Sequence, residues 1–115
     1  MNCREMSIIG NYPLQFLDNF NIEICFIGVG GISIDHGLTD YTVEEIEIKK
    51  QMIQRSKVKI ILADHTKFDR ATPIKICDLS KIDKIITSDE IEEKIKQKYE
   101  DYGIVIIVVK TNKDE

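Results

Sequence analysis

Three polar segments carry the residues whose types and spacing could bind a ligand. They are residues 30–41, residues 64–70 and the pair Thr87 and Ser88, and each follows an apolar run. The first and third lead into capped helices, where free backbone N–H groups and the helix dipole attract anions such as phosphate. Lys67 adds a positive charge that could meet such an anion. The simpler interpretation is that the capping residues only cap helices and Lys67 is a solvated loop lysine.

A glycine-rich turn, Gly28-Val29-Gly30-Gly31, follows the first apolar run and begins like a dinucleotide-binding fingerprint. Ser33 stands where the third glycine of that fingerprint belongs, and Gly37 follows where a helix should begin. We therefore expect no nicotinamide or flavin cofactor. The glycines instead predict a tight turn and a close approach of the backbone to a ligand.

The two histidines, His36 and His65, each follow an aspartate, Asp35 and Asp64. Such pairs can bind a metal or exchange protons. Two adjacent pairs in separate loops do not have a metal-ligand spacing, so hydrogen-bonded loop histidines are the simpler account. The loop serines also lie outside any G-x-S-x-G nucleophile motif. The sequence therefore predicts neither a metal site nor an assembled catalytic set.

The elements that must position these residues follow from apolar periodicity and helix-capping patterns. Strands are expected at residues 23–29, 58–63, 74–77, 84–86 and 104–109, and a short helix at residues 12–20. A capping box of Thr42 and Glu45 predicts a helix to about Arg55. A second box, Thr87 with Glu90, predicts a helix that ends near residue 102, before Gly103. Residues 111–115 are expected to form a polar tail.

Strands that alternate with helices predict an α/β fold, and strands that are almost continuously apolar predict a parallel sheet covered on both sides. The expected fold is a Rossmann-like, mainly parallel open sheet with helices on both faces. The 115 residues are the length of one domain. In such sheets ligands bind outside the carboxyl ends of the strands, and the three polar segments begin there.

Composition excludes several classes of protein. The chain is 43% hydrophobic and 31% charged, which is typical of a globular domain. Residues 104–109, the longest apolar run, are too few to cross a membrane, and residues 1–11 do not resemble a signal peptide. Three widely spaced cysteines fit a reducing compartment, so we expect a cytoplasmic protein. A net charge of −4 without a basic cluster argues against nucleic-acid binding by this chain.

Read in order, the segments FIGVGGIS, DHGLT, EIEIKKQMIQRS, KIILADHTKF and CDLSKIDKIITSDE resemble the effector-sensing region of DeoR-type bacterial transcriptional repressors. The resemblance covers residues 10–109. It implies a fold similar to ribose-5-phosphate isomerase and a ligand that is a phosphorylated sugar or related metabolite. It also implies a ligand site, which comprises the glycine turn (Gly28, Gly30, Gly31), the H-G-L-T segment (His36 to Thr39), the helix lysine (Lys49) and the D-x-[ST]-K motif (Asp64, Thr66, Lys67). The last motif is the best candidate for contacting the phosphate.

The resemblance begins after the family's N-terminal winged helix-turn-helix and after the first part of its sensor. It therefore implies a partial sensor domain over residues 1–115, truncated at its N-terminal side. Missing strands would leave a sheet edge and apolar surface exposed, so we expect a homo-oligomer.

The leading hypothesis is the effector-binding module of a DeoR-type regulator of sugar metabolism, which is not an enzyme and meets neither membrane nor nucleic acid itself. The alternative is a sugar-phosphate isomerase or related hydrolase that uses Asp35, His36, Asp64 and His65 as acids and bases. Ile27 and Gly30 stand where the related isomerases carry acidic residues, which weakens that alternative. A third hypothesis is a purely structural oligomerisation module.

Overall fold

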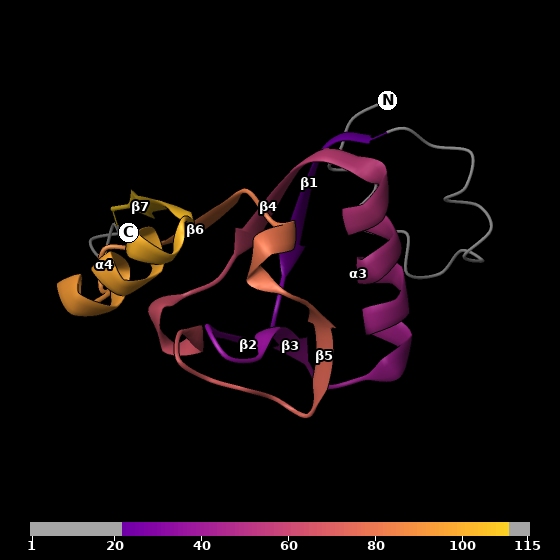
Figure 1. Cartoon of the computed structure of the whole chain (residues 1–115), viewed down its shortest axis with the longest axis horizontal. Helices are drawn as coiled ribbons and strands as arrows, with labels where there is room; N and C mark the ends of the chain where they lie inside the picture. Colours follow the sequence, from indigo (N-terminus) through magenta and orange to yellow (C-terminus); the bar gives the residue numbers. More distant parts are fainter. Residues whose placement is uncertain (1–21, 111–115) are drawn as a thin grey trace, which may run out of the picture.

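The computed structural model describes residues 22–110 of the chain. Its strands are β1 (Ile22–Gly28), β2 (Gly31–Ser33), β3 (Gly37–Asp40), β4 (Ser56–Leu62), β5 (Ile74–Cys77), β6 (Lys84–Ser88) and β7 (Val105–Val109). Its helices are α3 (Val43–Arg55) and α4 (Glu93–Tyr102), with short 3-10 helices η2 (His65–Lys67) and η3 (Leu79–Lys81) (Figure 1). The helix expected at residues 12–20 and the tail at 111–115 lie outside the described residues.

The strands form two sheets. Four of them make a parallel sheet in the order β1-β4-β6-β7, and the other three make a small antiparallel sheet in the order β2-β3-β5. The expected α/β fold with a mainly parallel sheet is therefore confirmed. The strand expected at residues 74–77 forms, but as β5 it pairs with β3 instead of joining the parallel sheet.

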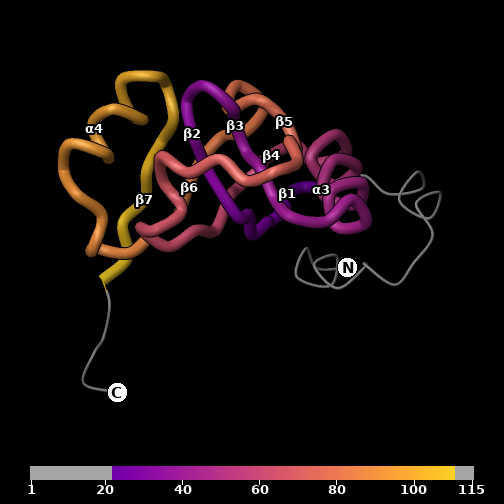
Figure 2. Tube along the Cα trace, turned by 90° about the horizontal axis from the view of Figure 1, so that it is seen from below, coloured from indigo at the N-terminus to yellow at the C-terminus, as the bar shows by residue number. Residues whose placement is uncertain are grey.

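The connections between the parallel strands all lie on one face of that sheet. The strand order advances in one direction from β1 to β7, and right-handed crossovers then place every connection on the same side. The buried core agrees, because Ile61 and Ile85 of the parallel sheet join Ile32 of the small sheet, Ile46 of α3 and Tyr99 of α4 in one cluster. Figure 2 shows α3 and α4 at opposite ends of the molecule with the strands between them. Within residues 22–110, helices thus cover only one face of the parallel sheet, whereas helices on both faces were expected from the sequence.

The opposite face of the parallel sheet is apolar and exposed. Alternate residues of a strand point to the same face of a sheet. The strand register therefore places Phe26 of β1 and Leu62 of β4 on this face. Six apolar side chains on this face are exposed, and their relative exposures range from 37% to 51%. We call this set the apolar sheet face; its members are Ile24, Phe26, Leu62, Val105, Ile107 and Val109.

Residues 30–41, expected as a loop, contain a β-hairpin. β2 and β3 pair antiparallel, with Gly31 opposite Thr39 and Ser33 opposite Gly37. The sequence did not reveal this hairpin because strands of three and four residues are too short to show an alternating pattern. The β2–β3 hairpin therefore packs against one side of the glycine turn.

The two expected helices form, but only one begins where its capping box indicated. Thr42 is the N-cap residue of α3, although its side chain makes no capping hydrogen bond. The box of Thr87 and Glu90 is wrong, because Thr87 continues β6 and α4 begins at Glu93. Pairing of Thr87 with Val108 of β7 extends the strand ladder, which is more favourable here than a helix start.

Among residues 22–110, neither α3 nor α4 has the length and apolar character that a membrane-spanning helix needs.

Candidate functional site

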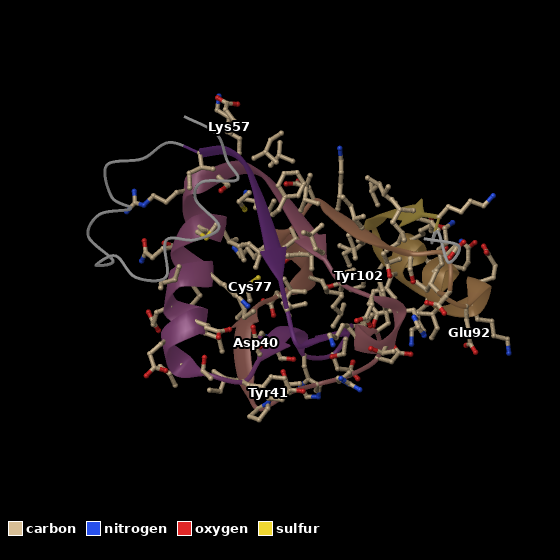
Figure 3. The ribbon with its side chains drawn as sticks, turned by 180° about the vertical axis from the view of Figure 1, so that it is seen from behind. Asp40, Tyr41, Lys57, Cys77, Glu92 and Tyr102 are labelled. Carbon is tan, nitrogen blue, oxygen red and sulfur yellow. The ribbon has the colours of Figure 1, made fainter. Side chains whose placement is uncertain are left out.

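The glycine turn and the Asp64 segment lie at the same edge of the parallel sheet. Gly28 at the end of β1 is paired with Leu62 at the end of β4, so the segments that follow these two strands start side by side. Figure 3 shows Asp40 and Tyr41, which close the hairpin after β1, far from Lys57 at the start of β4. The carboxyl edge expected from the sequence therefore brings the principal candidate residues into one region.

The glycines at this edge permit close packing of the chain against itself. A Cβ on Gly31 would lie 2.4 Å from the Arg70 carbonyl oxygen, and one on Gly30 would lie 2.9 Å from the ring of Tyr41. The Gly30 N–H donates to the Thr39 carbonyl at 3.0 Å. A Cβ on Gly28 would meet no atom closer than 4.0 Å. The close approach predicted for Gly30 and Gly31 is therefore made to the protein's own segments.

Lys49 is tied to the end of β1. Its ammonium group donates to the Gly28 carbonyl at 2.6 Å and to the carboxylate of Asp40, and Glu45 lies 3.7 Å away. Asp40 is buried, with 6% of its surface exposed. This lysine therefore fastens α3 to β1 and β3. Together with Gly28, Met52 and apolar side chains of β1 and β4, it also lines a pocket of about 370 Å³.

The turn that follows β4 is built around Asp64. Its carboxylate accepts hydrogen bonds from the Thr66 N–H at 2.8 Å and from the Thr66 hydroxyl, while the Lys67 ammonium lies 3.7 Å away. The hydrogen bond from the Thr66 hydroxyl lowers the pKa of Asp64, an effect that burial opposes and that the Thr66 N–H and Lys67 reinforce. The Asp64 carboxylate is therefore ionised at neutral pH and fixes the turn that presents Lys67.

The hairpin holds this turn beside the glycine turn. Phe68 forms a parallel bridge with Ile32, and the Arg70 N–H donates to the Ile32 carbonyl at 3.1 Å. Further along, the Thr72 N–H donates to the Thr39 hydroxyl at 2.8 Å. Thr39 is 2% exposed, so its hydroxyl acts as an internal connector of two segments. Lys67 is thus carried by a segment that packs directly against the strand after Gly30.

Other candidate residues are not brought together. His36 is exposed in the hairpin turn, where its backbone N–H donates to the Ser33 hydroxyl at 2.9 Å. His65 Nδ1 instead lies 3.7 Å from a carboxylate oxygen of Glu90. Within residues 22–110, no hydrogen bond or ion pair joins the Asp35–His36 pair to the Asp64–His65 pair. In the same part of the chain, no three His, Cys, Asp or Glu side chains gather in a way that could hold a metal ion.

The helix start on which an anion site near Thr87 and Ser88 was expected is not formed there, because both residues belong to β6 and α4 begins at Glu93. Thr87 is buried within β6, at 2% exposure, and the Ser88 hydroxyl only accepts a long 3.4 Å bond from the Glu90 N–H. Glu92 and Glu93 occupy the start of α4, and their negative charges repel an anion there.

A buried tyrosine of α4, Tyr99, secures the Lys67 segment. The Tyr99 hydroxyl lies 2.8 Å from Asp69 Oδ1 and 3.2 Å from the Ile32 carbonyl, and Lys98 pairs with Asp69 at 2.8 Å. Burial, together with the hydrogen bond to Asp69, raises the pKa of Tyr99. Burial works against ionisation of Asp69, but its bonds from Lys98 and Tyr99 still lower its pKa. The positive φ of Asp69, 58°, fits this tightly turned connection.

Comparisons with known proteins agree with this architecture. The profile of the family described as "DeoR C terminal sensor domain" matches residues 1–89. The HTH-type transcriptional regulator IolR of Bacillus subtilis is 31% identical over 100 residues, which are 87% of this chain and 40% of the relative. The HTH-type transcriptional regulator GolR of Listeria innocua is 28% identical over 106 residues, 92% of this chain and 42% of the relative.

A third relative carries a name that specifies a regulon. The glycerol-3-phosphate regulon repressor of Haemophilus influenzae is 30% identical over 82 residues, which are 71% of this chain and 32% of the relative. The chain therefore spans well under half the length of each of these three relatives.

Proposed function

The chain belongs to the family of DeoR C-terminal sensor domains, and we propose that its effector is a phosphorylated sugar or a related phosphorylated metabolite. The observation that carries the proposal is the position of Lys67 on a fixed turn at the carboxyl edge of the sheet, beside the glycine turn. The name of the Haemophilus influenzae relative, which contains a phosphorylated three-carbon compound, supports the same ligand class. In the whole regulator, we propose, effector binding here changes DNA binding elsewhere, since the sequence of this chain is acidic overall and has no run of basic residues.

We propose different roles for the candidate residues. Lys67 contacts the phosphoryl group directly, because within residues 22–110 its ammonium group has a single charged partner, 3.7 Å away, and its side chain is 29% exposed. Thr66 and Asp64 set the turn that presents it. Lys49 shapes the neighbouring pocket but has its hydrogen bonds satisfied by the protein. The remaining candidates, Gly28, Gly30, Gly31, His36 and Thr39, form the hairpin and glycine turn around the site.

Lys67→Ala is expected to weaken binding of a phosphorylated effector about tenfold or more, because it removes a charge-assisted hydrogen bond to the phosphate. Isothermal titration calorimetry with glycerol 3-phosphate and a panel of sugar phosphates measures the loss. Each ligand is paired with its unphosphorylated form, which should bind neither variant measurably.

Lys57→Ala is the matched control, because Lys57 is 74% exposed at the start of β4, away from the carboxyl edge. Its affinity should equal that of the unaltered chain. Equal binding of phosphorylated and unphosphorylated ligands, or no effect of Lys67→Ala, would contradict the proposed role of Lys67.

We also propose that the domain acts by binding and not by turnover. The acid and base candidates of the isomerase alternative, Asp35, His36, Asp64 and His65, lie in two groups without a mutual contact in the described region. General acid–base catalysis requires both groups within reach of the same substrate. The relatives named above are named as regulators or repressors, which supports the same proposal.

We propose in addition that the chain forms homo-oligomers through the apolar sheet face. Contiguous exposed apolar surface favours association, and within residues 22–110 the outer edge of β1 pairs with no strand. Phe26→Glu should therefore shift the protein toward monomer in sedimentation-velocity experiments at micromolar concentration. Val43→Glu, which alters an exposed apolar residue of α3, is the control and should leave assembly unchanged. An unaltered chain that sediments as a monomer would refute association.

A further inference from the structure

A second pocket, of about 340 Å³, lies between α3 and the segment that follows β5. Its volume is within the range of small-molecule sites. Ile53 and Ile76 form an apolar floor, each with 5% or less of its surface exposed. Three lysines and one glutamine provide the polar lining, and a half-buried cysteine, Cys77, completes it; the polar residues are Lys50, Gln54, Lys59 and Lys81. We call this cavity the lysine pocket.

The lysines of the pocket have no ion-pair partner among the described residues. Among the described residues, Lys50, Lys59 and Lys81 take part in no ion pair, and no carboxylate lines the cavity. Two carboxylates lie near the pocket: Asp78 is paired with Lys75 at 2.5 Å, and Asp83 accepts a hydrogen bond from the Lys59 backbone N–H at 2.8 Å. Three lysines therefore line one cavity in a chain whose net charge is −4.

This pocket is separate from the proposed effector site. Lys59 lies in the middle of β4 and Lys81 lies three residues before β6 begins, whereas the effector site lies beyond the carboxyl ends of the strands. The two regions have no lining residue in common. Figure 3 shows Cys77 between Lys57 and the Asp40–Tyr41 corner.

We propose that the lysine pocket binds a small polyanion, a compact metabolite with two or more phosphate or carboxylate groups. Like charges on three lysines that line one cavity repel one another, and a multiply charged anion relieves that repulsion while it accepts charge-assisted hydrogen bonds. The size of the cavity and the net negative charge of the chain favour a small anion over a nucleic acid. The apolar floor lets a short carbon skeleton pack beneath the charged groups.

Cys77 provides a reporter inside the pocket. Burial and the nearby Asp78 raise the pKa of its thiol to about 11, while Lys75, Lys81 and Lys50 lower it. A bound polyanion covers the thiol and cancels the lysine charges, so both effects slow alkylation. The measurement uses the full chain with Cys3→Ser and iodoacetamide at pH 9, since Cys25 is fully buried. Pyrophosphate and citrate are the two probes, and sodium chloride of equal ionic strength is the reference.

We expect pyrophosphate, citrate or both to protect Cys77 saturably, at least fivefold, with no such effect of sodium chloride. Lys59→Gln and Lys81→Gln should each weaken the protecting anion about tenfold, because each removes one charge-assisted bond. Lys57→Gln, an exposed lysine outside the pocket, is the matched control and should retain full protection. Protection is compared as a ratio within each variant, because loss of a lysine also slows the unprotected reaction.

Several results would overturn the proposal. Absence of protection at millimolar probe, or equal protection by sodium chloride, would show that no specific anion site exists. Unchanged protection in both glutamine variants would assign the effect to other residues. Loss of protection in Lys67→Ala would mean that the anion acts from the carboxyl edge, whereas its retention separates this site from the proposed effector site. Stronger protection by an oligonucleotide than by either probe would favour a macromolecular partner.

Discussion

Lys49→Met is expected to lower the free energy of unfolding by about 2–4 kcal/mol, one of the largest effects of any single change in this chain. Lys49 neutralises Asp40, whose side chain is 9% exposed, and also bonds to the Gly28 carbonyl. The methionine keeps most of the packing of the lysine stem but leaves a nearly buried carboxylate without its partner. The upper end of the expected range is reduced because 19% of the lysine side chain remains in contact with water. Chemical denaturation with urea measures the loss.

A double-mutant cycle tests the cause of that loss. Asp40→Asn removes the charge that Lys49 neutralises, so the double variant should be more stable than the sum of the two single losses predicts. Lys50→Met is the matched control. Lys50 is next to Lys49 in the chain, but its side chain is exposed and has no ion pair within the described structure. It should change stability by no more than about 0.5 kcal/mol. If Lys49→Met were no more destabilising than Lys50→Met, the pair would not hold α3 to β1.

Gly37→Ala is expected to destabilise the fold by about 3–5 kcal/mol, since backbone strain and a collision add together. Gly37 has φ of +73°, a region that side chains disfavour, and it begins β3. A Cβ at this position would also lie 2.2 Å from the carbonyl oxygen of Cys77. Relief requires β3 to move away from β5, which would break the small sheet. Thermal and urea unfolding both report the loss.

Gly103→Ala separates the two contributions. Gly103 also has a positive φ, +116°, but an added Cβ would meet nothing within 4 Å. Only the strain remains, so we expect a loss of about 1–2 kcal/mol. The difference between the two variants measures the collision with Cys77. Equal losses of stability in the two variants would show that β3 and β5 can move apart enough to remove the collision at no cost in free energy.

The parallel strands and both described helices could be predicted because their patterns are long and local. Ile60, Ile61 and Leu62 form an apolar run in β4, and Gly103 ends α4 as expected. The hairpin could not be predicted, since its two strands are short and its second strand, β3, also pairs with β5, which follows more than 30 residues later. Thr87 was assigned to a helix cap because a threonine followed by Glu90 satisfies the local rule, whereas the partner strand β7 comes 18 residues later.

The proximity of the candidate residues could be predicted from the sequence, but the contacts that each of them makes could not. The sequence places Gly28 and Asp64 after neighbouring strands, and the structure confirms that these strands are paired. It does not reveal that Lys49 is held by Asp40, because the aspartate lies nine residues away across a helix start. Nor does it reveal Tyr99, whose spacing fits an apolar helix face and whose hydroxyl meets Asp69 only after folding.

The one-directional strand order has a consequence for where an effector can sit. In open α/β sheets, the crevice that receives a ligand opens at the switch point, where successive connections pass from one face to the other. From β1 to β7 the connections never change face, so these strands contain no switch point, and β1 is the strand at which one can arise. If the proposed effector binds in such a crevice, we expect residues 22–110 to form one of its walls. Its affinity should then depend on the chain that lies along the edge of β1, which pairs with no strand among residues 22–110.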